Sequence, residues 1–300
     1  LVVIGGGPIG VEMAQAHRRL GCEVTVIEAA RVLGREDAEL AAVVTGALRA
    51  EGIALIEGQP VVRLAGQAGA VEVTLGDGQQ GRGSHLLIAV GRRVALEGMN
   101  LEAAGVAYTP KGVTVDTRLR SSNRRVYAVG EAAGGAQLTH VAGWHAGIVI
   151  RQAVLGLPAK ADPRAIPRVT YTDPELAQVG LTEAEARTAH GDALTVVRAE
   201  FAHNDRAQAE GRTKGLAKVM VVRGRPVGAS IVGPQAGELI GLWSLAISAR
   251  LKLSAIAGMV APYPTLGEVS KRAAGTYFSP KLFENPLLKR LVRVVQRWVP

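Results

Sequence analysis

The chain has 300 residues, of which 48% are hydrophobic and 20% charged, and its formal net charge at pH 7 is +9. This length predicts about two domains, and the apolar content excludes a disordered chain. The single cysteine, Cys22, cannot form an internal disulfide, and the sequence has no signal peptide and no apolar run of about 18 residues. We therefore expect a cytoplasmic protein.

The positive charge is concentrated at the C-terminal end of the sequence. Residues 281–300 contain five basic side chains and one acidic residue, Glu284, so this tail carries +4 of the total charge. Aromatic residues make up only 4% of the chain, and no helix-turn-helix pattern is present. The charge is therefore not expected to serve nucleic-acid binding.

The first 28 residues predict a strand, a glycine-rich turn, a helix and a second strand. Residues 1–4 form a buried apolar run, GGGPIG matches G-x-G-x-x-G, residues 11–20 have a helical pattern, and the strand over 23–27 ends at Glu28. This context is typical of a dinucleotide-binding βαβ unit, in which glycines admit the pyrophosphate and the helix start offers it free N–H groups. The predicted cofactor-binding residues are Gly5, Gly6, Gly7, Pro8, Ile9, Gly10 and Glu28.

The acid at the end of the second strand indicates which dinucleotide is bound. Glu28 is placed to accept hydrogen bonds from ribose hydroxyls, and its charge would repel a 2′-phosphate. NADH is therefore favoured over NADPH. Arg31 weakens this preference, because a nearby guanidinium could accommodate the phosphate.

The sequence patterns change along the rest of the chain. Up to residue 95 they predict a helix over 36–50, strands over 53–56, 61–64, 71–75 and 84–90, and a turn at Asp77-Gly78. Next come a strand over 125–129, a small-residue loop over 132–140, a helix over 141–155 and a proline-containing linker over 157–167. Strands over 169–172, 194–201, 216–222 and 226–232, with helices over 182–189 and 237–251, predict a separate antiparallel α+β domain.

Six segments occur in an order that resembles a known family: GGGPIGVE, VTVIE, IAVGRR, VYAVGEAAGGAQLTH, YTDPELAQVGLTEAEA and PYPTLGEVSKRAA. Together they resemble the flavoprotein disulfide reductases, within them the mercuric reductase and dihydrolipoamide dehydrogenase branch. The resemblance implies an α/β fold with four regions: a Rossmann-type NAD(P)-binding domain over 1–95, the C-terminal part of an FAD-binding domain over 96–160, an interface (dimerisation) domain over 161–280 and a basic amphipathic tail over 281–300.

The family carries an N-terminal FAD segment with its own glycine motif and a C-x-x-x-x-C redox pair, neither of which is in this sequence. Because the chain also starts at Leu1 inside a strand, we expect a fragment of a longer polypeptide, with apolar surface exposed where that segment would pack.

The resemblance implies further cofactor contacts. Gly91 would pass close to the nicotinamide, Gly130 and Glu131 would approach the flavin ribitol, where the family usually has Asp, and Glu12 would lie near the flavin or be an ordinary first-turn glutamate. A helix start would touch the flavin through Gln137, Leu138, Thr139 and His140, with His140 as a backbone contributor. A small-residue packing turn is the alternative for this loop.

The turn APYPTLGE resembles the one that supplies an acid/base group across the dimer. Dihydrolipoamide dehydrogenases have His at the Tyr263 position, paired with the Glu268 position, whereas mercuric reductases have Tyr. A tyrosine, with a pKa near ~10, exchanges protons poorly at neutral pH. Tyr263 therefore argues against efficient lipoamide chemistry. The mercuric reductase resemblance is also incomplete, because this sequence lacks the C-terminal cysteine pair of those enzymes. An interface aromatic without chemistry is the alternative.

These observations predict a homodimeric FAD-dependent oxidoreductase that passes hydride from NAD(P)H through flavin to a disulfide or metal-thiolate acceptor, with Tyr263, Glu268 and Glu12 as catalytic residues. One alternative is a quinone reductase or transhydrogenase-like flavoprotein without a redox disulfide, and another is a non-catalytic nucleotide-binding dimeric fragment. The histidines have no metal-ligand spacing, so no metal site is predicted. The amphipathic tail could rest on an anionic membrane, but packing on its own dimer is favoured.

Overall fold

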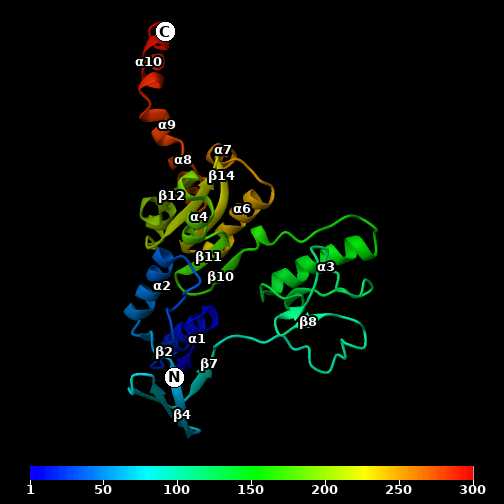
Figure 1. Ribbon diagram of the computed structural model, residues 1–300. Coiled ribbons are helices and arrows are strands. Elements are labelled where there is room, and N and C mark those ends of the chain that lie inside the picture. Colours follow the sequence, from blue (N-terminus) through cyan, green and yellow to red (C-terminus); the bar gives the residue numbers. More distant parts are fainter. Residues whose placement is uncertain (300) are drawn as a thin grey trace. The chain divides into compact units, whose positions relative to one another are not determined.

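The computed structural model describes residues 1–299 and divides into two compact units. Unit 1 combines residues 1–90 with the chain from Pro167 onward, and unit 2 comprises residues 91–166. Figure 1 shows the parallel and antiparallel sheets that make up the mixed architecture. The predicted α/β fold class is confirmed, whereas the predicted boundaries at residues 95, 160 and 280 stay predictions.

Unit 1 opens with the expected βαβ unit. Its parallel sheet has the order β3-β2-β1-β7, and Val3 of β1 is in register with Val26 of β2 and Leu87 of β7. The elements are β1 (Val2–Ile4), α1 (Pro8–Arg19), β2 (Thr25–Glu28), α2 (Ala38–Ala50), β3 (Ala54–Glu57) and β7 (Leu86–Ile88). Helix α1 begins three residues earlier than predicted, because Pro8 is well suited to the first helical position.

A three-stranded antiparallel sheet adjoins this unit in the sequence. It consists of β4 (Val61–Gln67), β5 (Ala70–Leu75) and β6 (Gln80–Gly83). The turn at Asp77-Gly78 is confirmed, since the Asp77 carboxylate accepts the N–H of Gln79 and Gly78 has a φ of +87°. Strand β6 was not predicted because its sequence, QGRG, has no apolar residue.

The second half of unit 1 is a five-stranded antiparallel sheet with the order β10-β11-β14-β13-β12. Its strands are β10 (Arg168–Thr170), β11 (Glu175–Gly180), β12 (Leu194–Glu200), β13 (Leu216–Val222) and β14 (Arg225–Gly233). Its helices are α4 (Glu183–His190), α5 (Asp205–Ala209), α6 (Ala236–Ser248), α7 (Leu253–Ala257) and α8 (Glu268–Thr276). Strand β11, absent from the prediction, pairs along its whole length with β14.

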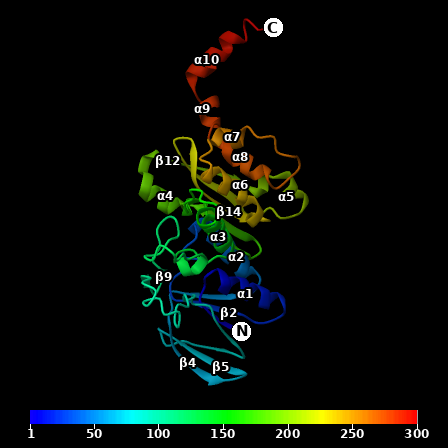
Figure 2. The same ribbon diagram turned by 90° about the vertical axis from the view of Figure 1, so that its right-hand side faces the viewer.

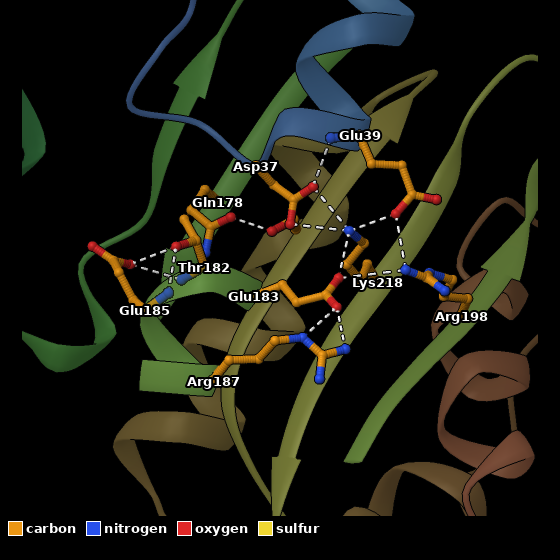
Figure 3. Close-up of polar contacts among 10 residues, drawn as sticks. Asp37, Glu39, Gln178, Thr182, Glu183, Glu185, Arg187, Arg198 and Lys218 are labelled. Atoms are coloured by element: carbon orange, nitrogen blue, oxygen red, sulfur yellow. Dashed lines mark hydrogen bonds and ion pairs between the residues drawn. The ribbon is translucent and has the colours of Figure 1, made fainter. Parts of the chain in front are cut away.

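The two halves of unit 1 share one core and one buried ion cluster. Leu176 and Val232 from the antiparallel sheet belong to the same apolar cluster as Val26 and Leu40 from the βαβ unit. Figure 3 shows Lys218 of β13 directed at carboxylates from two helix starts. Its Nζ lies 2.9 Å from Asp37, the N-cap of α2, 2.5 Å from Glu39 and 2.9 Å from Glu183 of α4.

The Lys218 side chain is only 2% exposed, so its charge depends on these partners. Burial alone would lower the pKa of Lys218, but the hydrogen bonds that its ammonium donates to Glu183, Glu39 and Asp37 raise it above its usual value. The pKa of Glu183 is lowered, because Lys218 and Arg187 outweigh the opposing effect of its own burial. The cluster therefore fixes the start of α2 on the antiparallel sheet.

Unit 2 is built from short elements around a small core. It contains β8 (Tyr108–Thr109), β9 (Gly112–Val113), the 3₁₀ turn η1 (Gly130–Ala133) and α3 (Thr139–Ala153). The predicted strand over 125–129 is wrong, because its ladder pairing is limited to an isolated bridge between Tyr127 and Arg120. Helix α3 starts at Thr139, two residues earlier than predicted.

The C-terminal residues form two short helices, α9 (Ser279–Phe283) and α10 (Pro286–Val295), which follow α8 at the end of the chain (Figure 2). The Asn285 side chain caps α10 by accepting the N–H groups of Leu287 and Leu288. Across residues 1–299, no helix is long and apolar enough to span a bilayer.

Candidate dinucleotide and catalytic sites

The glycine turn between β1 and α1 is closely packed on one side and open on the other. Gly5 has a φ of +105°, and a Cβ there would come within 2.5 Å of the Ala89 carbonyl oxygen. A Cβ at Gly10 would overlap the Gly5 carbonyl oxygen, whereas a Cβ at Gly7 would meet nothing within 4 Å. Gly5 and Gly10 thus let the backbone fold tightly, and Gly7 leaves the outer face accessible.

Helix α1 presents its first turn without a competing anion. Gly7 is its N-cap, no side chain caps it, and no acidic residue lies in its first turn. Pro8 occupies the first position and has no N–H to satisfy, and the Ile9 side chain is exposed. The remaining backbone N–H groups and the positive end of the helix dipole suit a phosphate group.

The Glu28 carboxylate holds this turn from the end of β2. Its Oε2 accepts the N–H of Gly6 at 2.7 Å and its Oε1 accepts the N–H of Ala30 at 2.9 Å. A carboxylate has about four acceptor positions, so two remain for ribose hydroxyls. Arg31 is exposed in the loop that follows β2 and donates to the Gly34 carbonyl at 3.5 Å, so the acid and the base that bear on coenzyme choice lie three residues apart in the chain.

Glu12 is engaged within unit 1. Its Oε1 accepts the backbone N–H of Tyr171, just after β10, at 2.8 Å. Burial raises the pKa of Glu12, and the Tyr171 N–H partly offsets this increase. The residue therefore ties α1 to the segment that follows β10, a contact between residues 159 positions apart that no local sequence pattern predicts.

In unit 2, Arg92 connects two of the predicted flavin residues. Its Nη1 lies 2.9 Å from Glu131 Oε1, and its Nη2 donates to the Gln137 carbonyl oxygen. The Glu131 side chain is about half exposed. Arg92 follows Gly91, which has a φ of +130°. Arg92 belongs to the segment IAVGRR, and no role was predicted for it from the sequence.

A buried histidine in the middle of α3 holds the start of η1. Gly130 donates its N–H to His145 Nδ1 at 3.1 Å, and burial lowers the pKa of His145, so the ring is neutral with its hydrogen on Nε2. Leu138 is the N-cap residue of α3 and makes no side-chain capping hydrogen bond.

The turn with Tyr263 places that side chain next to an acid missed in the sequence. Tyr263 is 70% exposed and donates its hydroxyl to Asp205 Oδ2 at 2.8 Å. The hydrogen bond to Asp205, with the charges of Asp205 and Glu268, raises the pKa of Tyr263. Glu268 begins α8 and accepts the N–H of Thr265 at 3.3 Å. Tyr263 is therefore a neutral hydrogen-bond donor at pH 7.

Among residues 1–299, no group of three or more His, Cys, Asp or Glu side chains is arranged to hold a metal ion.

The Asn204 side chain caps α5 by accepting the N–H of Ala207, and it also donates to the Thr265 carbonyl at 3.0 Å. It thereby fixes the position of Asp205 relative to the Tyr263 turn. The hydrogen bonds from Asn204 to Thr265 and from Tyr263 to Asp205 join segments that are about 60 residues apart in the chain. The only sequence feature that pointed to them is the adjacent polar pair Asn204-Asp205.

A parallel sheet with this glycine turn, joined to an antiparallel α+β sheet, defines a dinucleotide-binding protein with a second structural domain. Residues 1–146 match the pyridine nucleotide-disulphide oxidoreductase family and residues 166–274 match the dimerisation domain of that family. The chain belongs to the pyridine nucleotide-disulphide oxidoreductase family.

Curated relatives include a dihydrolipoyl dehydrogenase from Bacillus subtilis, 33% identical over 277 residues, and a mercuric reductase from Streptomyces lividans, 36% identical over 285 residues. These alignments cover 91% and 93% of this chain and 60% of each relative. The chain thus spans about three fifths of the length of the curated relatives it matches.

Solved structures with this fold include LpdA from Mycobacterium tuberculosis, with a TM-score of 0.86 and 29% identity, covering 92% of this chain and 61% of LpdA. The Cu(II) complex of the HOCl-induced flavoprotein disulfide reductase RclA from Escherichia coli has a TM-score of 0.84 and 30% identity, covering 92% of this chain and 63% of RclA.

Proposed function

We propose that this chain is the nicotinamide-binding and dimerising part of a cytoplasmic, homodimeric, FAD-dependent oxidoreductase that uses NADH in preference to NADPH. The observation that carries the proposal is the glycine turn, in which an uncapped helix start lies beside a carboxylate that already holds the turn. Phosphate would bind at the N–H groups of α1, and the ribose would bind Glu28. The 2′-phosphate of NADPH would be repelled by the Glu28 carboxylate, and this repulsion favours NADH.

The residues of unit 2 fit a flavin. The uncapped start of α3 offers N–H groups to a region of negative charge, and Arg92 holds both Glu131 and the Gln137 carbonyl in place. Flavin, when bound, accepts hydride from a nicotinamide and passes the electrons on, while the protein supplies orientation and charge stabilisation. Gly91 and Gly130 would let the backbone approach the cofactors closely.

The Tyr263 turn favours a disulfide or metal-thiolate as the electron acceptor. A phenol whose pKa is raised above its ordinary value stays protonated at pH 7 and is a poor base, and its one O–H would have to turn from Asp205 to donate to a bound thiolate. In the proposed homodimer Tyr263 and Glu268 would act on the site of the other subunit. The relatives named mercuric reductase support this acceptor class.

Calorimetric titration of the chain with NADH and with NADPH tests the proposal. We expect tighter binding of NADH, and a loss of at least tenfold for Glu28→Ala but not for Glu23→Ala, a matched change at an exposed acid before β2. Absence of heat with either coenzyme in folded protein would overturn the proposal. Binding of nucleotide without flavin binding or NADH oxidation by the full-length polypeptide would instead identify a non-catalytic nucleotide-binding protein.

A further inference from the structure

The last helix segregates its side chains by type. From Leu287 to Val299, all the apolar residues fall on one side at 3.6 residues per turn, and the polar residues fall on the other side. The apolar side comprises Leu287, Leu288, Leu291, Val292, Val294, Val295, Trp298 and Val299. The polar side comprises Lys289, Arg290, Arg293, Gln296 and Arg297, and includes no acid.

The apolar side of this helix is uncovered. No residue of α10 is buried, and exposure is 74% at Leu287 and 58% at Leu291 of the helix and 82% at Trp298, in the turn that follows it. By contrast, α8, which packs on β12 and β13, buries Val269, Ser270, Ala273 and Ala274. A contiguous exposed apolar surface bordered by charge is characteristic of an interaction site.

Charge indicates what covers this surface. A second copy of the chain carries a net charge of +9, so it would bring positive charge to a helix whose polar side is entirely basic. The match to the family's dimerisation domain also ends at residue 274, before α9 and α10 begin. An anionic surface is the complementary partner, and an amphipathic helix with a basic polar side is suited to the interface of a bilayer.

We propose that α10 lies in the plane of an anionic lipid bilayer, with its apolar side in the acyl boundary and its arginines at the headgroups. Lys289, Arg290, Arg293 and Arg297 would bring four positive charges to such a surface, and their attraction to anionic headgroups weakens as salt rises. The apolar side chains add their burial, and Trp298 lies in the turn after α10, where its aromatic ring would favour the interface. The helix would attach the protein to the surface without crossing the bilayer.

Flotation with two kinds of vesicle tests this proposal. We expect the chain to float with vesicles of phosphatidylcholine and phosphatidylglycerol, to remain in solution with phosphatidylcholine alone, and to be released by high salt. Leu291→Asp, on the apolar side, and Arg293→Glu, on the polar side, should each reduce the floated fraction at least fivefold. Val260→Asp, at an exposed residue outside α10, should leave it unchanged.

The competing occupant is a second copy of this chain. Light scattering on the same variants would overturn the proposal if Leu291→Asp converted dimers to monomers without an effect on flotation. Equal flotation of the full chain and of a chain ending at residue 280 would overturn it as well. Circular dichroism melting curves provide the folding control, and the variants should unfold like wild type because α10 buries no side chain.

Discussion

Lys218 gives the sharpest stability prediction, because its charge is buried at the junction of the two halves of unit 1. Replacing it in Lys218→Met keeps most of the side-chain volume and removes the cation from Asp37, Glu39 and Glu183. Arg187 and Arg198 still reach Glu183, and Arg198 also reaches Glu39. The largest penalty therefore falls on Asp37, whose side chain is only 4% exposed.

Breaking a buried ion pair by removing one partner costs about 3–5 kcal/mol, and the surviving arginines place this variant near the lower end, at about 3 kcal/mol. For a unit of this size each kcal/mol lowers Tm by about 2–4 °C, so we expect a decrease of roughly 6–12 °C by calorimetry. The double variant Lys218→Met/Asp37→Asn should be more stable than Lys218→Met by about 1 kcal/mol or more in free energy of unfolding, because Asp37→Asn removes the buried carboxylate that has lost its cation.

The control is Lys214→Met, at an exposed lysine just before β13. A Tm for Lys218→Met within about 2 °C of this control would refute the reasoning, since about 3 kcal/mol corresponds to a larger decrease.

The pH dependence of the Tm difference provides a second check. The Lys218 pKa is raised and the Glu183 pKa lowered, so the difference between variant and wild type should persist at neutral pH and decline as pH falls below the Glu183 range, about 4.3.

Three further variants extend the account. Because burial raises the pKa of Glu12, its ionisation costs stability above about pH 4.5, so Glu12→Gln should raise Tm at pH 8 by a few degrees; an unchanged or lower Tm would count against the buried carboxylate. The pKa of His145 is lowered, so protonation below about pH 6.5 destabilises unit 2; urea unfolding of His145→Asn should lose less stability between pH 7.5 and 5.5 than wild type, and equal losses would contradict this. Tyr263→Phe should decrease kcat of the full-length enzyme about tenfold with little change in the KM for NADH; unchanged turnover would make Tyr263 an interface residue.

Elements governed by local pattern could be predicted from the sequence. The glycines of the first turn and the acid at Glu28 specify a βαβ unit because the strand, turn, helix and second strand follow one another within 28 residues. The capping box of α4, in which Thr182 and Glu185 exchange hydrogen bonds, is likewise specified by a motif of four consecutive residues. Such signals depend little on the rest of the fold.

Contacts between distant residues could not be predicted in this way. Lys218 and Asp37 are 181 residues apart, and only strand register and the start of α2 bring them together. The segment 125–129 has strand-like residues, but a strand needs a neighbour, and among residues 1–299 its ladder pairing is one bridge to Arg120. Asp205 is a similar case, because its role emerges only when the Tyr263 turn folds against α5.

Hydrogen exchange of the chain with and without NADH tests the dinucleotide site most directly. We predict that NADH slows exchange at the N–H groups of residues 6–12, the glycine turn and first helical turn held by Glu28, and that Glu28→Ala abolishes most of this protection. Protection confined to other segments, or none at saturating NADH in folded protein, would contradict the assignment of the coenzyme to this turn.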